Sequence, residues 1–311
     1  MKKRLLTGLQ PSGSLHIGNY FGALQPFIDN CDGFESFLMI ADYHALTSLK
    51  NPEELRTNTL NIIKDYLAVG LDPKKVVIFR QSDNQDHMEL AWIFNCLVTV
   101  PFLQQAHSYK DKVAKGIEPN AGLFTYPMLQ AADIALYDTD VVPVGEDQRQ
   151  HLEYTREAVG KFNRAFGDVL KEPKEMIYDS VGVVPGIDGQ KMSKSYKNTI
   201  PLFGSTEEIS KAVMSIVTDS DGDRPEHVYA IHKLFRSTEE LDELYDQHKG
   251  RYGDLKKLLA EDIDAFIAPL RERRAQLTNE EVAQVLDEGA HQAKQVSNQT
   301  LAKVRKSIGI A

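Results

Sequence analysis

Cysteine is scarce in this sequence. The 311 residues contain two cysteines, Cys31 and Cys96, which stand 65 positions apart without a neighbouring histidine cluster. This spacing lacks the ligand pattern of a zinc or iron–sulfur site, and two reduced thiols in the core of a cytosolic protein are the expected arrangement. We therefore expect neither zinc nor an iron–sulfur cluster.

Long apolar runs are also missing. No window approaches the roughly 18 apolar residues that a membrane helix needs. The apolar run after the basic start, at Leu5 and Leu6, stops after two residues and is too short for a signal peptide. The sequence therefore predicts a cytoplasmic protein that does not contact a membrane.

Positive charge is in the minority. Lys+Arg 36 against Asp+Glu 45 gives a net charge of −9, which disfavours nonspecific coating of nucleic acid but allows a local basic groove. The hydrophobic fraction of 42% and the charged fraction of 26% are typical of a globular chain. A chain of this length suggests about two domains.

Short apolar runs alternate with longer amphipathic segments in the first two thirds of the chain. The predicted strands are residues 5–8, 37–41, 76–79 and 141–144. The predicted helices are residues 18–31, 53–69 and 147–166. Asn51 and Pro52 are typical of a helix cap and first turn. Strands joined by crossover helices imply a parallel sheet.

Strand signals disappear after Thr206. The predicted helices of this last part are residues 207–217, 238–248, 254–274 and 279–306. We therefore expect an α/β domain over residues 1–200 and an all-α domain over residues 201–311.

A glycine-containing loop, Pro11 to Asn19, follows the first predicted strand and precedes a helix. Such a turn places unpaired backbone N–H groups where a phosphate can bind. His16 and Asn19 supply donors, and Gly18 would let a ligand approach the backbone. The spacing matches neither GxGxxG nor GxxxxGK[ST], and an ordinary turn is the alternative.

A second loop, Pro185 to Ser195, carries two lysines and two glycines. Lys191 and Lys194 stand three residues apart, and such cations stabilise the charge that develops on a polyphosphate in a transition state. A solvated basic loop is the alternative.

The third constellation lies on a predicted helix. Tyr126, Gln130 and Asp133 share one face of it, and a carboxylate on an otherwise apolar helix favours a position facing a ligand. Residues 145–147 follow a predicted strand and precede a helix, again at the rim where parallel sheets bind ligands. A capped or exposed Asp133 is the alternative.

In combination, these motifs resemble class I aminoacyl-tRNA synthetases. HIGN at residues 16–19 and KMSKS at residues 191–195, about 175 residues apart, are similar to the two signatures of that class. The segments whose amino-acid sequence resembles that of tryptophanyl-tRNA synthetases are residues 8–13, 42–45, 121–127, 131–134 and 142–148. The resemblance covers nearly the whole chain and implies a Rossmann-like, doubly wound parallel sheet followed by an all-α domain.

The resemblance also implies roles for individual residues. Those matching the ATP site are Gln10, Pro11, Ser12, Gly18, Asn19, Gly145, Glu146, Asp147, Val184, Lys191, Met192, Ser193, Lys194 and Ser195. Those matching the tryptophan site are Leu6, Gly8, His44, Tyr126, Gln130, Asp133 and Gln148. Catalytic roles are implied for His16, Lys112, Lys191, Lys194 and Ser195. Asp133 would accept a hydrogen bond from the indole N–H.

The activity implied is that of a tryptophan–tRNA ligase. ATP, as its Mg²⁺ complex without metal ligands from the protein, would activate L-tryptophan to the adenylate, which then esterifies tRNA(Trp). A homodimer is implied, to which the apolar helix at residues 90–94 could contribute, although a core position for Trp92 is favoured. The basic residues expected to meet tRNA, with plain helix faces as the alternative, are Arg271, Arg273, Arg274, Lys294, Lys303, Arg305 and Lys306. Salt-sensitive binding through few phosphates is expected.

Two positions depart from the tryptophan-specific pattern. Many bacterial members have Phe at the position of Leu6 and Met at that of Gln130, and the resulting helix pattern is also similar to tyrosyl-tRNA synthetases. Those enzymes usually have a tyrosine hydroxyl where Leu6 stands, so tryptophan is favoured. A small-molecule nucleotidylyltransferase and a non-enzymatic synthetase paralogue are further alternatives. The helical tail argues against the first and the complete signatures against the second.

Overall fold

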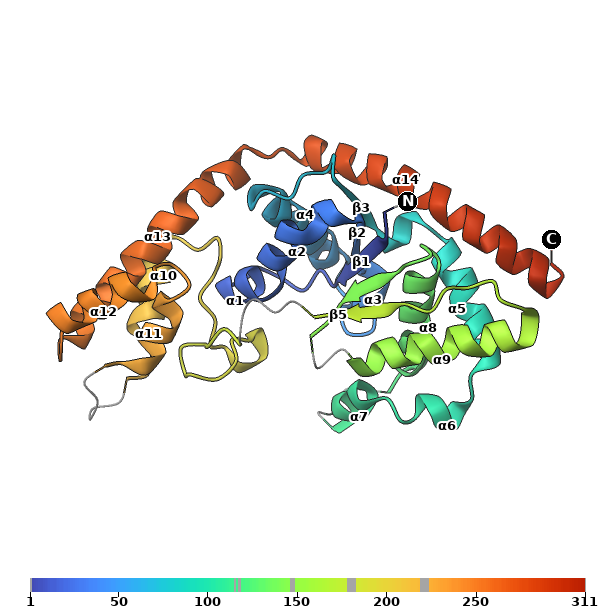
Figure 1. Cartoon of the computed structure of the whole chain (residues 1–311), viewed down its shortest axis with the longest axis horizontal. Helices are drawn as coiled ribbons and strands as arrows, with labels where there is room; N and C mark the ends of the chain where they lie inside the picture. Colours follow the sequence, from blue (N-terminus) through green and yellow to red (C-terminus); the bar gives the residue numbers. More distant parts are fainter. Residues whose placement is uncertain are drawn as a thin grey trace.

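A five-stranded parallel sheet forms the centre of the computed structural model (Figure 1). The structure describes residues 2–114, 116, 119–145, 149–177, 183–218 and 224–310, without the side chains of residues 107, 108, 111 and 112. The strands lie in the order β3-β2-β1-β4-β5. Their bounds are β1 Arg4–Leu9, β2 Glu35–Ile40, β3 Val76–Arg80, β4 Val141–Pro143 and β5 Lys174–Met176. The expected parallel α/β sheet is thereby confirmed.

Successive residues of β1, β2 and β3 enter two different cores. Leu5 and Ile78 pack in a cluster on one face of the sheet, whereas Leu6 and Phe79 pack in a cluster on the other face. Both faces of these strands are covered, because side chains alternate along a strand and each face of a doubly wound sheet packs against a helix layer.

Helices of the first two thirds cover these faces. Their bounds are α1 Ile17–Asn19, α2 Gln25–Asn30, α3 Asp42–Ala45, α4 Pro52–Ala68, α5 Asp86–Leu97, α6 Val100–Leu103, α7 His107–Ala114, α8 Ala121–Ala135 and α9 Arg149–Phe166. The cap predicted for α4 is confirmed, since the Asn51 side chain accepts hydrogen bonds from the backbone N–H groups of Glu53 and Glu54.

The helix predicted from Gly18 to residue 31 is confirmed in extent, but it is not a regular α-helix throughout. A π-helical turn, Tyr20–Leu24, separates α1 from α2, and the Gln25 N–H donates to the Tyr20 carbonyl five residues back. Pro26 explains the change, because it lacks an N–H and its ring would collide with the carbonyl four residues earlier in a regular α-helix.

Helices are the only regular elements of the described chain after residue 205. Their bounds are α10 Thr206–Met214, α11 Glu226–His232, α12 Thr238–Gln247, α13 Tyr252–Gln276 and α14 Asn279–Ile308. Three of them, α10, α12 and α14, begin with a Ser or Thr cap and a Glu three residues later, which satisfy each other's backbone N–H groups. The predicted helices are confirmed, and α11 was not predicted.

The last helix, α14, returns from the helical region and runs across the α/β region (Figure 1). It packs on β3, and a Cβ atom added to Gly289 would stand 1.8 Å from the Ile78 carbonyl oxygen. Such an approach of two backbones is open only to glycine. The expected division at residue 200 stays a prediction, and α14 lies against the first part of the chain.

Two expectations about burial are wrong. Trp92 is 70% exposed, because Leu90, Ala91 and Phe94 occupy the inward face of α5 and Trp92 points the other way. Cys96 is exposed, while Cys31 is buried as expected. Helix periodicity explains both differences, since neighbours on a helix are rotated by about 100°.

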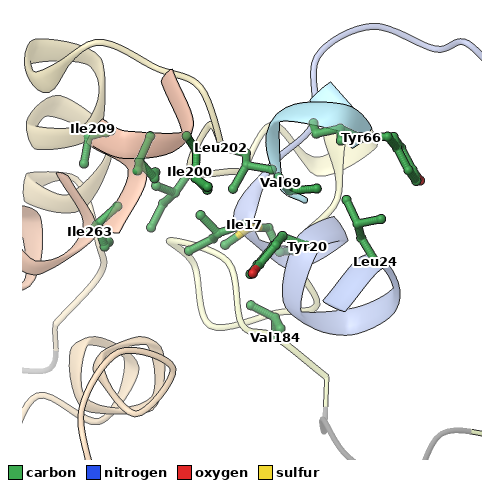
Figure 2. Packing of buried hydrophobic residues seen from close by; sticks show 14 of the residues in the cluster. Ile17, Tyr20, Leu24, Tyr66, Val69, Val184, Ile200, Leu202, Ile209 and Ile263 are labelled. Atoms are coloured by element: carbon green, nitrogen blue, oxygen red, sulfur yellow. The ribbon is translucent and has the colours of Figure 1, made fainter. Parts of the chain in front are cut away.

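The two parts of the chain share a hydrophobic seam (Figure 2). Ile17 and Tyr20, at the start of the first helical segment, pack with Ile200 and Leu202 of the segment that follows the lysine-containing loop. Ile263 of α13 belongs to the same cluster. The first loop is therefore held between the sheet and the helical region.

Candidate active site

A cavity of about 360 Å³ opens at the carboxyl ends of the central strands. It lies where the strand order reverses, between β1 and β4, which is the usual ligand site of open parallel sheets. The residues that line it are Leu6, Thr7, Gly8, Gln10, Met39, Ala41, His44, Thr47, Tyr126, Gln130, Asp133, Ile134, Val142, Pro143, Val144 and His151. Its wall is mixed: aliphatic side chains such as those of Leu6, Ile134 and Val142 stand beside polar ones such as those of His44, Gln130 and His151.

Asp133 of α8 is the charged group of this cavity, and it is 2% exposed. Its Oδ2 accepts a hydrogen bond from His44 Nε2 at 2.8 Å, and its Oδ1 accepts from Gln81 Nε2 at 2.8 Å and from His87 Nδ1 at 2.7 Å. Burial raises the pKa of Asp133, but the hydrogen bonds from the two histidines outweigh it and bring the pKa to about 2. The carboxylate is therefore ionised and acts only as an acceptor.

Tyr126 and Gln130 come from the same helix as Asp133, and all three line the cavity. The Tyr126 hydroxyl forms a hydrogen bond with His151 Nε2 at 2.7 Å, and its ring meets that of His44 edge-on at 6.1 Å between centroids. Burial raises the pKa of Tyr126 to about 12, so the phenol is neutral. The aromatic edges and the aliphatic wall formed by Leu6 together suit a flat apolar ligand.

His16 and Asn19 cap the first helical segment reciprocally. The Asn19 N–H donates to His16 Nδ1 at 3.2 Å, and the His16 N–H donates to Asn19 Oδ1 at 3.1 Å. In a neutral imidazole this leaves the proton on Nε2, where it can be donated. The sequence pattern suggested donors at both residues, and the structure shows that each also accepts.

The two signature loops touch although about 175 residues separate them. Lys194 Nζ donates to the Ser12 carbonyl at 2.6 Å and to the Gly13 carbonyl at 3.2 Å. A Cβ atom on Gly18 would stand 3.1 Å from Met192 Cβ. The lysine-containing loop thus packs directly on the first loop, and the Met192 N–H donates to the Val184 carbonyl at 2.9 Å.

Most of the predicted ATP residues surround this contact. Pro11, Val184 and Met192 are buried, whereas Ser12, Lys191, Lys194, Ser195 and Gly145 are exposed. Gln10 lines the cavity, and Ser193 caps the short helical turn at residues 194–196. Glu146, Asp147, Gln148 and the Lys112 side chain lie outside the described residues, and the Lys112 backbone belongs to α7.

Several residues of the site were not found from the sequence. Gln81 directly follows β3, so the rule that ligands bind at the carboxyl ends of parallel strands could have indicated it. His87, Tyr137 and His151 carry no spacing signal, because they lie on α5, in the turn after α8 and on α9.

Four of the basic residues expected to meet tRNA pair within the chain. Arg274 and Asp65 form an ion pair with 2.5 Å between Nε and Oδ1, and Lys294 and Asp86 form one with 2.7 Å between Nζ and Oδ1. Arg271 pairs with Asp264, and Arg305 pairs with Glu89. For these four side chains the helix-face alternative is favoured. Arg273, Lys303 and Lys306 are exposed.

A His16→Asn variant isolates the titration of His16. Burial, followed by the Lys194 charge, lowers the pKa of His16 from 6.5 to about 4. Between these pH values the unfolded chain binds a proton that the folded chain does not, so the free energy of unfolding falls as the pH falls. Asn keeps the cap but does not titrate. In urea titrations we expect the wild type to lose up to about 1 kcal/mol more per pH unit than the variant, allowing for solvent screening; equal losses would contradict this.

Comparison with known proteins agrees with this geometry. The family described as tRNA synthetases class I (W and Y) matches residues 1–288. The chain belongs to this class I synthetase family. Within the class I synthetase family it is 47% identical to the tryptophan–tRNA ligase of Fusobacterium nucleatum over 319 residues, which covers 99% of this chain and 98% of that one. The tryptophan–tRNA ligase of Rhodopirellula baltica is 43% identical, with 99% of each chain covered.

A solved structure of the class I synthetase family shows the same arrangement. The tryptophanyl-tRNA synthetase of Campylobacter jejuni, complexed with ADP and tryptophan, superposes with a TM-score of 0.93 at 42% identity, covering 98% of this chain and 99% of that one. In the present chain, no helix among the described residues is both long and apolar enough to cross a membrane.

Proposed function

We propose that this enzyme is specific for L-tryptophan: it activates the amino acid with ATP to tryptophanyl-adenylate and pyrophosphate, then transfers it to the terminal adenosine of tRNA(Trp). The single observation that carries the proposal is the ionised Asp133, a buried acceptor that lines the cavity together with apolar residues such as Leu6 and Ile134. A buried acceptor of this kind recognises an apolar ligand that carries one N–H donor.

Recognition follows from the donors and walls of the cavity. The indole N–H would donate to Asp133, whose Oδ2 accepts from His44, while Leu6 packs against the ring. Phenylalanine has no donor and would leave the carboxylate short of a partner. Sites that hydrogen-bond their substrate reject such analogues by on the order of 10⁴–10⁵, a value known for a tyrosine-specific synthetase. Leu6 offers no hydrogen bond to a phenol, which disfavours tyrosine.

The first chemical step is a transfer of the adenylyl group. A tryptophan carboxylate oxygen attacks the α-phosphorus of ATP, the new P–O bond forms, and the bond to the pyrophosphate oxygen breaks. The substrate is ATP with its Mg²⁺. Lys191, Lys194 and Ser195 stabilise the charge on the departing pyrophosphate, and Lys112 is proposed to approach the phosphates from α7. Positioning and electrostatic stabilisation account for most of the acceleration in such reactions.

His16 and Asn19 hold the nucleotide at the first loop. With Nδ1 engaged by a backbone N–H, His16 presents Nε2–H, and the low pKa keeps the ring neutral. In the second step, a ribose hydroxyl of the terminal adenosine attacks the carbonyl carbon of the adenylate. The ester C–O bond forms, the anhydride C–O bond to AMP breaks, and the hydroxyl proton passes to the phosphate oxygen of the departing AMP.

The helical region, residues 201–311, is the proposed anticodon-binding domain, and residues 1–200 are the proposed catalytic domain. Exposed basic residues that could meet the tRNA backbone include Arg273, Lys303 and Lys306. A homodimer is proposed as well. Its support is the apolar surface of α5, where Trp92 is 70% and Met88 48% exposed, since exposed apolar patches of this kind mark interfaces.

Pyrophosphate exchange with each of the twenty amino acids tests the proposal. We expect ATP–pyrophosphate exchange to depend on tryptophan, with phenylalanine and tyrosine at least about 10³-fold less effective in kcat/KM. Exchange that requires a different acceptor would support a nucleotidylyltransferase and overturn the proposal. Absence of exchange with any amino acid would support a non-enzymatic role.

A further inference from the structure

A chain of buried polar groups connects α14 to the carboxylate of Asp133. Ser297 Oγ lies 2.8 Å from Asn84 Nδ2, which lies 3.1 Å from the Tyr137 hydroxyl. That hydroxyl lies 2.7 Å from His87 Nε2, and His87 Nδ1 lies 2.7 Å from Asp133 Oδ1. Asp133 is 2% exposed, and the other four residues are not exposed at all. Each distance is that of a hydrogen bond in a site without room for alternatives.

With a neutral His87 ring, the direction of every hydrogen bond in this chain is determined. Because the Asp133 carboxylate only accepts, His87 must donate from Nδ1. In the neutral ring Nε2 is then an acceptor, so the Tyr137 hydroxyl donates to it. The Tyr137 oxygen in turn accepts from the amide of Asn84.

The side chain that sets the direction is the amide of Asn84, whose two ends are chemically different. Its Oδ1 accepts from Lys294 Nζ at 3.1 Å and from the Asp86 N–H at 3.2 Å. An ammonium group can only donate, so the carbonyl end must face Lys294 and the NH₂ end must face Tyr137. Ser297 holds the NH₂ end, and its hydroxyl donates to Asp86 Oδ2 at 2.7 Å.

We propose that Lys294 and Ser297 of α14 are positioning residues that fix the orientation and hydrogen-bonding state of the Asp133 carboxylate. The proposal rests on the proposed function, in which this carboxylate recognises the indole. It gives the last helix a part in tryptophan recognition, although neither of its two residues lines the cavity.

Reversal of the Asn84 amide shows what the two residues prevent. With its carbonyl toward Tyr137, the amide would accept a hydrogen bond from the hydroxyl, and His87 Nε2 would lose its hydrogen-bond donor. A ring that shifted its proton to Nε2 would turn a lone pair of Nδ1 toward the Asp133 carboxylate. In a buried site such a repulsive contact displaces the carboxylate from its position.

Two variants test this chain of hydrogen bonds without substrate. In Asn84→Asp the new carboxylate, kept ionised by Lys294, accepts a hydrogen bond from the Tyr137 hydroxyl. The double variant Lys294→Met/Ser297→Ala removes both contacts from α14. We expect ¹⁵N-histidine NMR of the wild type to show His87 neutral with its proton on Nδ1, and both variants to lose that signature. The matched control is Asn95→Asp, because Asn95 lies on α5 and donates to the Ala91 carbonyl.

Kinetics supply the second reading. In both variants we expect the KM for tryptophan to rise about five- to tenfold while the KM for ATP changes by less than about twofold. Lys294→Arg retains a donor-only cation and should restore the wild-type KM. An unchanged His87 signature, an unchanged KM for tryptophan, or an equal rise of both KM values would overturn the proposal.

Failure of the proposal for Lys294 and Ser297 is distinguishable from failure of the proposed function. If wild-type exchange depends on another amino acid, the assignment to tryptophan is wrong. The NMR comparison then still tests whether Lys294 and Ser297 act as positioning residues, because it needs neither substrate nor activity.

Discussion

An Asp133→Asn variant is expected to lose about 10²–10³-fold in kcat/KM for tryptophan-dependent pyrophosphate exchange. The change removes the charge that attracts the indole N–H, and it places an NH₂ group among three donors, those of His44, Gln81 and His87. At least one of these donors then loses its acceptor, which costs roughly 1–3 kcal/mol besides the lost substrate contact. Initial rates over a range of tryptophan concentrations measure the effect.

The matched control is Asp138→Asn. Asp138 follows the same helix, and its left-handed backbone conformation, with φ of 52°, is one that Asn also adopts. Its side chain is 38% exposed, at 4.0 Å from Arg4. The control should exchange at the wild-type rate. If Asp133→Asn retained tryptophan kcat/KM within about threefold, the carboxylate would not be the indole acceptor.

A Lys194→Ala variant is expected to form adenylate about 10²–10³-fold more slowly while binding tryptophan nearly as well as the wild type. Lys194 Nζ lies on the carbonyls of Ser12 and Gly13, at the loop proposed to hold the nucleotide. Loss of one charge-stabilising donor typically costs this much in kcat. Tryptophan contacts a different part of the site, so its Kd should change little. Single-turnover adenylate formation and calorimetric titration with tryptophan separate the two quantities.

Lys211→Ala is the control for Lys194→Ala. Lys211 lies on α10 and is exposed, so its removal changes the net charge equally without touching the signature loops. A Lys194→Ala enzyme that formed adenylate at the Lys211→Ala rate would contradict the role given to the amino group. Equal losses in adenylate formation and tryptophan affinity would point to a structural effect instead.

Residues in regular elements were predictable because their pattern is local. The apolar runs that form β1, β2, β3 and β4 and the caps of α4 and α14 depend on near neighbours in the sequence. The strand β5 has three residues and is held in place by pairing with β4, so its own residues carry almost no signal.

Site residues were predictable where one helix or loop carries them. Tyr126, Gln130 and Asp133 follow helical spacing, and the HIGN and KMSKS loops carry their own wording. The partners of Asp133 come instead from α3, from the turn after β3 and from α5, and they become neighbours only through the fold. The basic residues around Lys294 in the sequence suggest a tRNA-binding surface, whereas the partner of Lys294, Asp86, lies 208 positions away in the sequence.

The path of α14 affects how the protein folds during synthesis. Ile78 lies on an outer strand of the sheet and is made 211 residues before Gly289, the residue that packs on it. At translation rates of about 5–20 residues per second, this delay is roughly 10–40 s. Throughout that interval β3 lacks the helix that packs on it, and uncovered strand edges can pair with other chains. Ribosome-bound intermediates of this protein are therefore prone to aggregation until nearly the whole chain has been made.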